Sequence, residues 1–207
     1  MVSQAVERPR RTQEERSAET RARLMEATID CLVDLGYART TTTVVSDRAG
    51  VSRGAQLHHF PTKADLVTSA IEYLANRRGE DLLHEAQERL SYGDRISAAI
   101  DLLVGSFSGP LFYAVLELWV AARTDSELRA KLLPLERRIG KSMRQLGQQL
   151  FGEEFIKRPG FDGALQLTVH LLRGIALGRL LKEDETREAE LLESWKWMVT
   201  QLLAANK

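Results

Sequence analysis

Apolar residues recur at helical spacing along almost the whole chain, and no segment alternates apolar and polar residues as a half-buried strand does. The first strong segment places three apolar side chains on one helix face, at Met25, Ile29 and Leu32. We expect Gly36 to end this helix. The helix begins at Ser17, or as early as Thr12, where Thr-Gln-Glu-Glu has the form of a capping box. The pattern predicts an all-α protein.

The rest of the chain divides into further helices at capping residues and turns, which makes about nine helices in all. Thr62 is the expected cap of a long helix that runs to about Leu90. Residues 152–160 form the clearest loop. The other expected helices are Thr42–Ala49, Arg53–Phe60, Asp94–Phe107, Pro110–Arg123, Ser126–Phe151, Asp162–Leu181 and Glu185–Ala205.

The two short helices after Gly36 have the anatomy of a helix-turn-helix. Each has fewer than three turns and cannot bury much surface alone, so both must pack on the first helix. The side chains expected at that contact are Val45, Ala49, Val51, Leu57 and Phe60. Gly50 allows a sharp turn with positive φ, and the Ser52 hydroxyl can cap the second short helix. The second helix of such a motif enters the major groove of DNA.

Polar side chains of this segment suit contacts with the DNA backbone. Thr41 and Thr43 place hydroxyls and free N–H groups at a helix start, where a phosphate can dock. Ser52 lies at the start of the second helix in the same way, and Lys63 offers a compact charge for a phosphate. Taken alone, the threonine run over 40–43 favours a plain loop-and-cap role.

Other side chains of the second helix suit base reading. Arg53 can reach a guanine edge or a phosphate, and Gln56 can pair with N6 and N7 of adenine. Gly54 removes a side chain where helix and DNA backbone approach. His58 and His59 follow on the same helix, pointing about 100° apart, so they do not form a metal site by themselves.

These residues resemble the TetR/AcrR family of transcriptional regulators. Residues 50–55 and 58–66 are similar to the family's recognition helix and following turn, and residues 36–42 to its link between first and second helices. The similarity spans residues 18–68, roughly a quarter of the chain. It departs at Leu57, where the family usually has a tyrosine that touches the DNA backbone, and at Gln56, where an apolar or small residue is common.

The resemblance implies a domain order and a function. Residues 1–16 are expected to be a basic flexible arm, 17–63 the DNA-binding domain, and 64–207 a helical ligand-sensing and dimerisation domain. The implied function is that of a homodimeric repressor, released from a near-palindromic operator when a small, largely apolar ligand binds. A DNA-binding regulator that responds to no ligand remains the alternative.

The last two helices carry more apolar surface than one subunit needs to close its core. The helix over 162–181 is apolar on several faces, and Gly174 and Gly178 allow close helix contact. The resemblance implies a four-helix interface between two subunits. The interface residues that we expect are Leu171, Gly174, Ile175, Gly178, Leu191, Trp195, Met198 and Leu202. Closure of the monomer's own core is the alternative.

A ligand pocket is expected in the C-terminal half, because apolar surroundings with a few placed polar groups are typical of such sites. Its candidate lining is Leu103, Phe107, Phe112, Leu116, Trp119, Met143, Leu146, Leu167 and His170, with Glu117 and Arg173 as orienting charges. The alternative is that Glu117 and Arg173 neutralise one another in the core and that the aromatic residues fill space.

Composition excludes several classes of protein. The balance of 43% hydrophobic and 28% charged residues is that of a globular domain, and the formal net charge is zero. Residues 1–63 carry ten Lys and Arg against eight Asp and Glu, a weak basic bias. The charged first residues exclude a signal peptide and 164–181 is too interrupted for a membrane span, so we expect a cytoplasmic protein.

An enzyme is the main rival class. The sequence has no glycine-rich phosphate loop, serine elbow or metal-spaced His/Cys set, so we expect no cofactor and no metal. The single cysteine, Cys31, lies on an apolar helix stripe, which is typical of a packed residue and not of a nucleophile.

Overall fold

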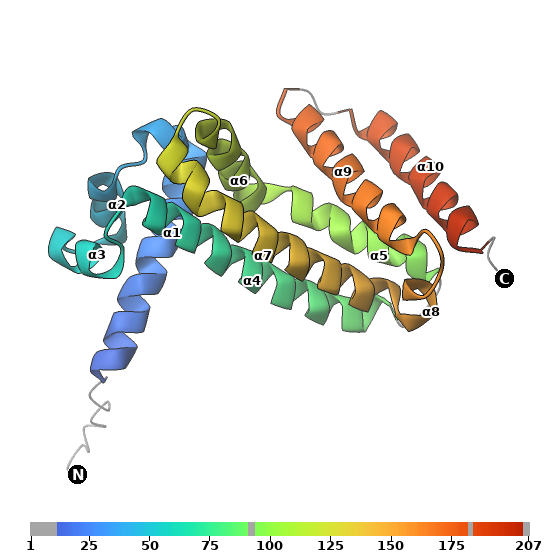
Figure 1. Ribbon diagram of the computed structural model, residues 1–207, viewed down its shortest axis with the longest axis horizontal. Coiled ribbons are helices and arrows are strands. Elements are labelled where there is room, and N and C mark those ends of the chain that lie inside the picture. Colours follow the sequence, from blue (N-terminus) through green and yellow to red (C-terminus); the bar gives the residue numbers. More distant parts are fainter. Residues whose placement is uncertain (1–11, 91–93, 182–183, 205–207) are drawn as a thin grey trace, which may run out of the picture.

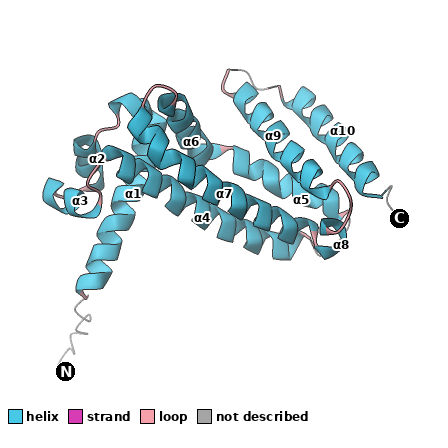
Figure 2. Ribbon diagram, in the orientation of Figure 1, coloured by secondary structure: helices cyan, strands magenta, loops and turns pink. Residues whose placement is uncertain are grey.

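The computed structural model describes residues 12–90, 94–181 and 184–204, and within these ranges every regular element is a helix (Figure 1, Figure 2). The all-α expectation is therefore confirmed. The helices are α1 (Gln13–Arg39), α2 (Thr42–Ala49), α3 (Arg53–His59), α4 (Lys63–Arg89), α5 (Arg95–Val104), the 3₁₀ turn η1 (Gly105–Phe107), α6 (Gly109–Ala122), α7 (Ser126–Phe151), α8 (Glu153–Ile156), α9 (Phe161–Arg179) and α10 (Glu185–Ala204).

Helix α1 begins earlier than the predicted arm allows. Thr12 and Glu15 form the complete capping box: the Thr12 N–H donates to Glu15 Oε2 at 2.8 Å, and the Glu15 N–H donates to Thr12 Oγ1 at 3.1 Å. Residues 13–16 are thus helical, which corrects the flexible arm over 1–16, while 1–11 lie outside the described residues. Gly36, with a φ of +73°, interrupts α1 as expected, and one further turn follows it.

Two other expectations about elements change. The predicted loop over 152–160 contains the single-turn helix α8, whose Phe155 and Ile156 N–H groups donate to the Gly152 carbonyl. The predicted helix over Asp94–Phe107 is α5 followed by a tighter 3₁₀ turn, which is a common way for a helix to end.

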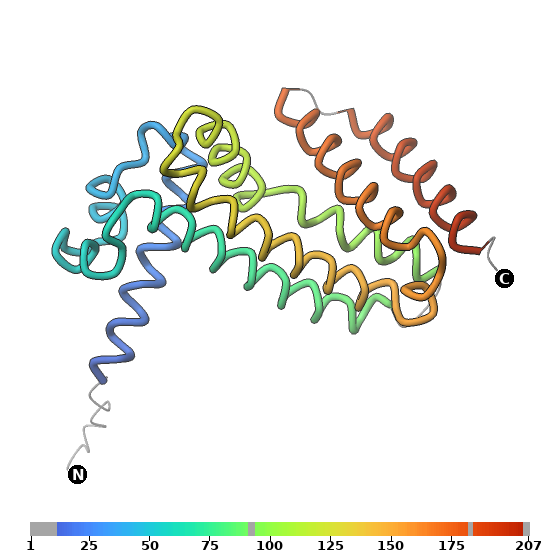
Figure 3. Tube along the Cα trace, in the orientation of Figure 1, coloured from blue at the N-terminus to red at the C-terminus, as the bar shows by residue number. Residues whose placement is uncertain are grey.

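The long helices α4 and α7 lie side by side and form the body of the molecule, with α1–α3 at one end and α9 and α10 at the other (Figure 1, Figure 3). Two apolar clusters fill it. The first joins α1 and α2 to α4, α6 and α7, and the second joins α4, α5, α7, α9 and α10. The first cluster crosses the predicted domain boundary at residue 63, so packing between the two predicted domains is continuous.

Cys31 lies in the first cluster and is fully buried. Burial raises the pKa of its thiol, which keeps the sulfur protonated, as expected for a packing residue. As for membrane spans, no single helix in the described ranges has the length and apolar character to cross a bilayer. Only α5 with η1 and α6, taken together across a 62° bend, reach that length and composition.

Candidate nucleic-acid interface

The turn between α2 and α3 is built by local capping and held by α1. Gly50 has φ +60° and ψ +40°, the left-handed conformation that a helix C-cap favours. The Arg23 guanidinium of α1 donates to the carbonyls of Ala49 and, at 2.8 Å, of Gly50. Ser52 Oγ then accepts from the Ala55 N–H at 3.3 Å, which starts α3. The sequence prediction of a capped helix-turn-helix is confirmed.

Helix α3 has one solvent-facing side. Arg53, Gly54, Leu57 and His58 are exposed, and their spacing of i, i+1, i+4 and i+5 puts them on one face. We call these four residues the reading face. An added Cβ at Gly54 would meet no atom within 4 Å, so nothing inside the protein requires a glycine there. Outside α3, Thr41, Thr43 and Ser52 are also exposed at helix starts.

Two expectations for α3 are wrong: the side chain expected to be exposed is buried, and the one expected to be buried is exposed. Gln56, expected to read adenine, is 0% exposed, and its Nε2 donates to the Phe60 carbonyl at 2.7 Å. Leu57, expected in the core, is 46% exposed on the reading face. The α3 register explains both, because the side of the helix opposite the reading face carries Gln56 and packs inward against α1. A hydrogen bond to a C-terminal carbonyl lets an amide occupy a position that polarity alone assigns to the surface.

Most cations near the reading face already have partners within the protein. Arg23 binds the turn, Arg48 pairs with Asp34 at 2.7 Å, and the Arg21 guanidinium lies 5.5 Å from the centroid of the Phe60 ring. Arg53, by contrast, has no hydrogen bond or ion pair with any residue that the structure describes. An exposed guanidinium with five free donors is what binding to a phosphate or a guanine edge requires.

The Lys63 ammonium is less free to bind a DNA phosphate than the sequence suggests. Its Nζ donates to the Tyr37 carbonyl at 2.6 Å and lies 3.7 Å from the centroid of that ring. Burial lowers the pKa of the Lys63 ammonium, against the opposing effect of the Asp125 carboxylate. Lys63 therefore links the start of α4 to the end of α1. His59 is half-buried, and burial lowers the pKa of its imidazole.

Tyr37 joins the end of α1 to three other helices. Its N–H donates to Glu117 Oε2 of α6 at 2.9 Å, its carbonyl accepts from Lys63 of α4, and its hydroxyl donates to Asp125 Oδ2 at 3.2 Å. Asp125 is also the N-cap of α7, where it accepts from the Leu128 N–H. We call this set of contacts the Tyr37 junction. Burial, aided by the Asp125 charge, raises the pKa of the Tyr37 phenol to about 12.

The ligand pocket expected in the C-terminal half corresponds to a cavity of about 650 Å³ between α6, α7 and α9. Six of its eleven predicted residues line it, namely Phe107, Phe112, Trp119, Met143, His170 and Arg173. The volume is within the range of small-molecule sites, and the lining combines apolar walls with a few polar groups. Ile139, Leu165 and Val169 also line the cavity but were missed, because a helical stripe does not show which apolar residues face space.

Five pocket predictions are wrong. Leu103 is fully buried in the second cluster, and Leu167 is 57% exposed on α9. Leu146 lines a neighbouring cavity of about 220 Å³, which shares Ile139 and Met143 with the first. Leu116 does not line the pocket, and Glu117 is exposed in the Tyr37 junction. The alternative of a Glu117–Arg173 pair is wrong too.

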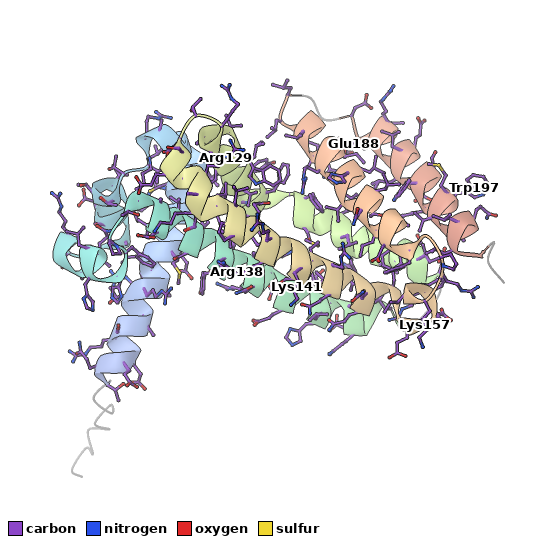
Figure 4. The ribbon with its side chains drawn as sticks, in the orientation of Figure 1. Arg129, Arg138, Lys141, Lys157, Glu188 and Trp197 are labelled. Carbon is purple, nitrogen blue, oxygen red and sulfur yellow. The ribbon has the colours of Figure 1, made fainter. Side chains whose placement is uncertain are left out.

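The outer face of α9 and α10 is rich in exposed apolar side chains. The predicted interface residues Leu191, Met198 and Leu202 are each more than two-fifths exposed, Leu171 and Ile175 are half-buried, and Gly174 and Gly178 are open. Trp195 is half-buried, and its indole N–H donates to Thr168 Oγ1 at 2.9 Å within the same subunit. Trp197, which was not predicted, projects from the outer side of α10 and is 65% exposed (Figure 4).

Comparison with known proteins gives relatives that cover nearly the whole chain. The family described as bacterial regulatory proteins, tetR family, matches residues 24–70. An uncharacterized HTH-type transcriptional regulator of Mycobacterium tuberculosis is 31% identical over 197 residues, which are 95% of this chain and 98% of the relative. The HTH-type transcriptional regulator CymR of Pseudomonas putida is 32% identical over 182 residues, 86% of this chain and 88% of its own.

A solved structure has the same fold. A TetR-family transcriptional regulator from Mesorhizobium loti superposes with a TM-score of 0.67 at 17% identity, over 92% of this chain and 98% of the other. At that identity the likeness concerns the arrangement of helices, and it covers both the helix-turn-helix end and the C-terminal bundle.

Proposed function

Because the chain belongs to the TetR family of DNA-binding transcriptional regulators, we propose that it is a repressor that reads its operator through Arg53 and the reading face of α3. The single observation that carries this proposal is the Arg53 guanidinium, exposed on a capped helix and without a partner among the described residues. Leu57 and His58 flank it on the same face. An exposed leucine there can contact a thymine methyl group or the sugar edge.

The start of α2 supplies the backbone contacts in this proposal. Thr41 is the N-cap, and its Oγ1 accepts from the Val44 N–H at 3.2 Å, which leaves the first N–H groups of the helix open to a phosphate. Thr43 is exposed on the same first turn. Ser52 plays the corresponding part for α3, with His58, His59 and Lys63 as secondary contacts.

We expect the protein to act as a two-fold dimer through the outer faces of α9 and α10. One helix-turn-helix reads only a few base pairs, and a second copy adds affinity and symmetry. Leu191, Met198 and Leu202 lie at spacings of seven and four along α10, so they form one apolar stripe. Gly174 and Gly178 allow a partner helix to approach α9 closely.

Ligand-controlled release is the second part of the proposal. Helices α6 and α7 line the cavity through Trp119 and Met143, and the same two helices hold Tyr37 through Glu117 and Asp125. A ligand that shifts α6 against α7 therefore changes the position of the end of α1 relative to the body. Release follows only to the extent that the ligand binds the DNA-incompetent arrangement more tightly.

The experiment that tests the reading role is selection of bound fragments from random duplex DNA, followed by titration of the selected site. We expect a near-palindromic site with two equal half-sites. Arg53→Ala should cost about 1–3 kcal/mol and relax one position of each half-site. Arg89→Ala, which removes an equal charge at the far end of α4, should leave affinity unchanged. Equal losses for both variants, or no selected sequence at low ionic strength, would contradict the proposal.

A further inference from the structure

The cavity between α6, α7 and α9 contains an unsatisfied cationic donor. Arg173 lines the cavity, and its guanidinium lies 4.5 Å from the centroid of the Trp119 ring. The Nε atom of Arg173 is buried and has no hydrogen-bond partner. No carboxylate within the described ranges pairs with this side chain. An arginine cannot lose its proton to escape that situation, so a buried N–H of this kind calls for an acceptor from outside.

The acidic side chains that line the cavity already have partners within the protein. Glu136 Oε1 accepts from the Trp119 indole N–H at 2.8 Å, which holds the ring beneath the guanidinium. Asp162 lies 3.8 Å from Arg144, measured between Oδ1 and Nη1. The exposed basic side chains of Arg137 and Lys141 also border the cavity. The lining therefore carries an excess of positive charge, to which the half-buried Arg173 contributes.

The rest of the wall is apolar. Phe107 and Phe112 meet edge to face with ring centroids 6.3 Å apart, and Met143, Leu165 and Val169 add aliphatic surface. A ligand that fits must bring an apolar body for this wall and an acceptor for the guanidinium.

We propose that this cavity binds an organic anion with an apolar body, whose carboxylate accepts hydrogen bonds from Arg173 Nε and one of its terminal nitrogens. The proposal deepens the proposed function, because it names the chemical class of the releasing ligand. The side-on edge of a guanidinium matches the two oxygens of a carboxylate, and charge-assisted bonds of this kind are the strong ones. His170, one turn before Arg173 on α9, is placed to donate a further bond to the same head group.

The same chemistry predicts weaker binding of other ligand classes. A neutral amide or alcohol offers a weaker acceptor to Arg173 than a carboxylate does. An ammonium ligand meets the like charge of the Arg173 guanidinium and leaves its Nε unsatisfied. The expected order of affinity is therefore carboxylate, then neutral analogue, then ammonium.

Isothermal titration calorimetry of the full chain without DNA tests this order. The probes are naphthalene-2-carboxylate and octanoate, each against its primary amide and its primary ammonium analogue, so that a ring and a chain are both sampled. We expect at least one carboxylate to bind about 10- to 150-fold more tightly than its amide, the range of a charge-assisted hydrogen bond. If neither carboxylate binds more tightly than its amide, the proposal is overturned.

Variants separate the role of Arg173 from general charge. Arg173→Gln should remove the preference for the carboxylate and leave amide binding unchanged, and Arg173→Lys should retain only part of the preference, because it lacks the fork. Arg89→Gln, exposed on α4 and outside the cavity, is the matched control. Thermal unfolding of each variant shows whether it folds. If Arg173→Gln does not fold, the carboxylate preference of Arg173→Lys tests the assignment. A preference that survives both substitutions would overturn the assignment.

A second measurement distinguishes the anion-site proposal from the proposal of ligand-controlled repression. The same probes are added to the protein bound to its selected operator, and release is followed by fluorescence anisotropy. Carboxylate binding without release would support the anion site and contradict ligand-controlled repression. Release by the neutral or ammonium analogue, but not by the carboxylate, would support control by ligand and contradict the anion site.

Discussion

Gly54→Ala should stabilise the protein and weaken its hold on DNA. Glycine costs a helix interior roughly 0.5–1 kcal/mol relative to alanine, because it loses more backbone freedom on folding. Gly54 lies in the first turn of α3 with helical backbone geometry, and an added Cβ would meet no atom within 4 Å. The substitution therefore carries no steric cost within the free protein. For a chain of this size, the expected gain raises the melting temperature by about 1–4 °C.

The expected effect on DNA binding has the opposite sign. If the reading face is pressed against a duplex, a methyl group at Gly54 overpacks that contact. Overpacking costs about 1–3 kcal/mol, which corresponds to a loss of affinity of about 5- to 150-fold. Fluorescence anisotropy with the selected operator measures the affinity, and calorimetric melting of the same preparation measures the stability.

A matched control is available at Gly163, in the first turn of α9, where an added Cβ also meets no atom within 4 Å. Gly163→Ala should give a similar gain in stability with no change in operator affinity. If Gly54→Ala binds the operator as tightly as the wild type, the glycine does not mark a close approach to DNA. If Gly54→Ala melts earlier than the wild type, the helix argument itself is wrong.

Four further outcomes are expected. Gln56→Ala should lower the free energy of unfolding by about 1–3 kcal/mol, because the buried Phe60 carbonyl loses its donor, and the selected sequence should not change; a changed base preference with full stability would contradict this. Glu117→Ala should leave probe binding in calorimetry intact but reduce probe-induced operator release, and unchanged release would remove this residue from the coupling route. Ultraviolet difference titration, with Tyr37→Phe as the reference, should give the Tyr37 phenol a pKa of about 12. Because this pKa lies above the usual value near 10, the stability that the neutral phenol contributes is complete below pH 10 and is lost as the pH rises towards 12. A measured pKa near 10 would disprove the Tyr37 junction. Leu202→Glu should convert the dimer to monomer in sedimentation experiments, while a dimer that persists would point to another interface.

The predictions for the DNA-binding end were confirmed where they depended on residues close together in the sequence. The capping box at Thr12, the positive φ at Gly50 and the caps at Ser52 and Thr62 each depend on residues within four positions of one another. Such signals act through backbone hydrogen bonds that any helix end must satisfy. The type and order of the main helices could therefore be predicted from the chain alone.

Expectations failed where a side chain's role depends on a distant partner. Polarity assigned Gln56 to the surface and Leu57 to the core, but the register of α3 on α1 decides which faces inward. Glu117 was expected in a ligand pocket, and its actual partner is the Tyr37 N–H, 80 positions away. The sequence does carry one usable signal, since Leu57 is four residues after Arg53 and therefore shares its face.

The amino-acid sequence by itself determined the all-helical fold and the helix-turn-helix, because caps, turns and apolar periodicity act over a few residues. The resemblance of residues 50–55 and 58–66 to a known recognition helix and turn indicated the family of regulators. Only the tertiary structure decided which cations remain free, that the end of α1 is held by α4, α6 and α7, and that Arg173 has a buried donor without an acceptor. Those properties depend on packing between helices far apart in the chain, where the space around a side chain, and not its type, determines what it can bind.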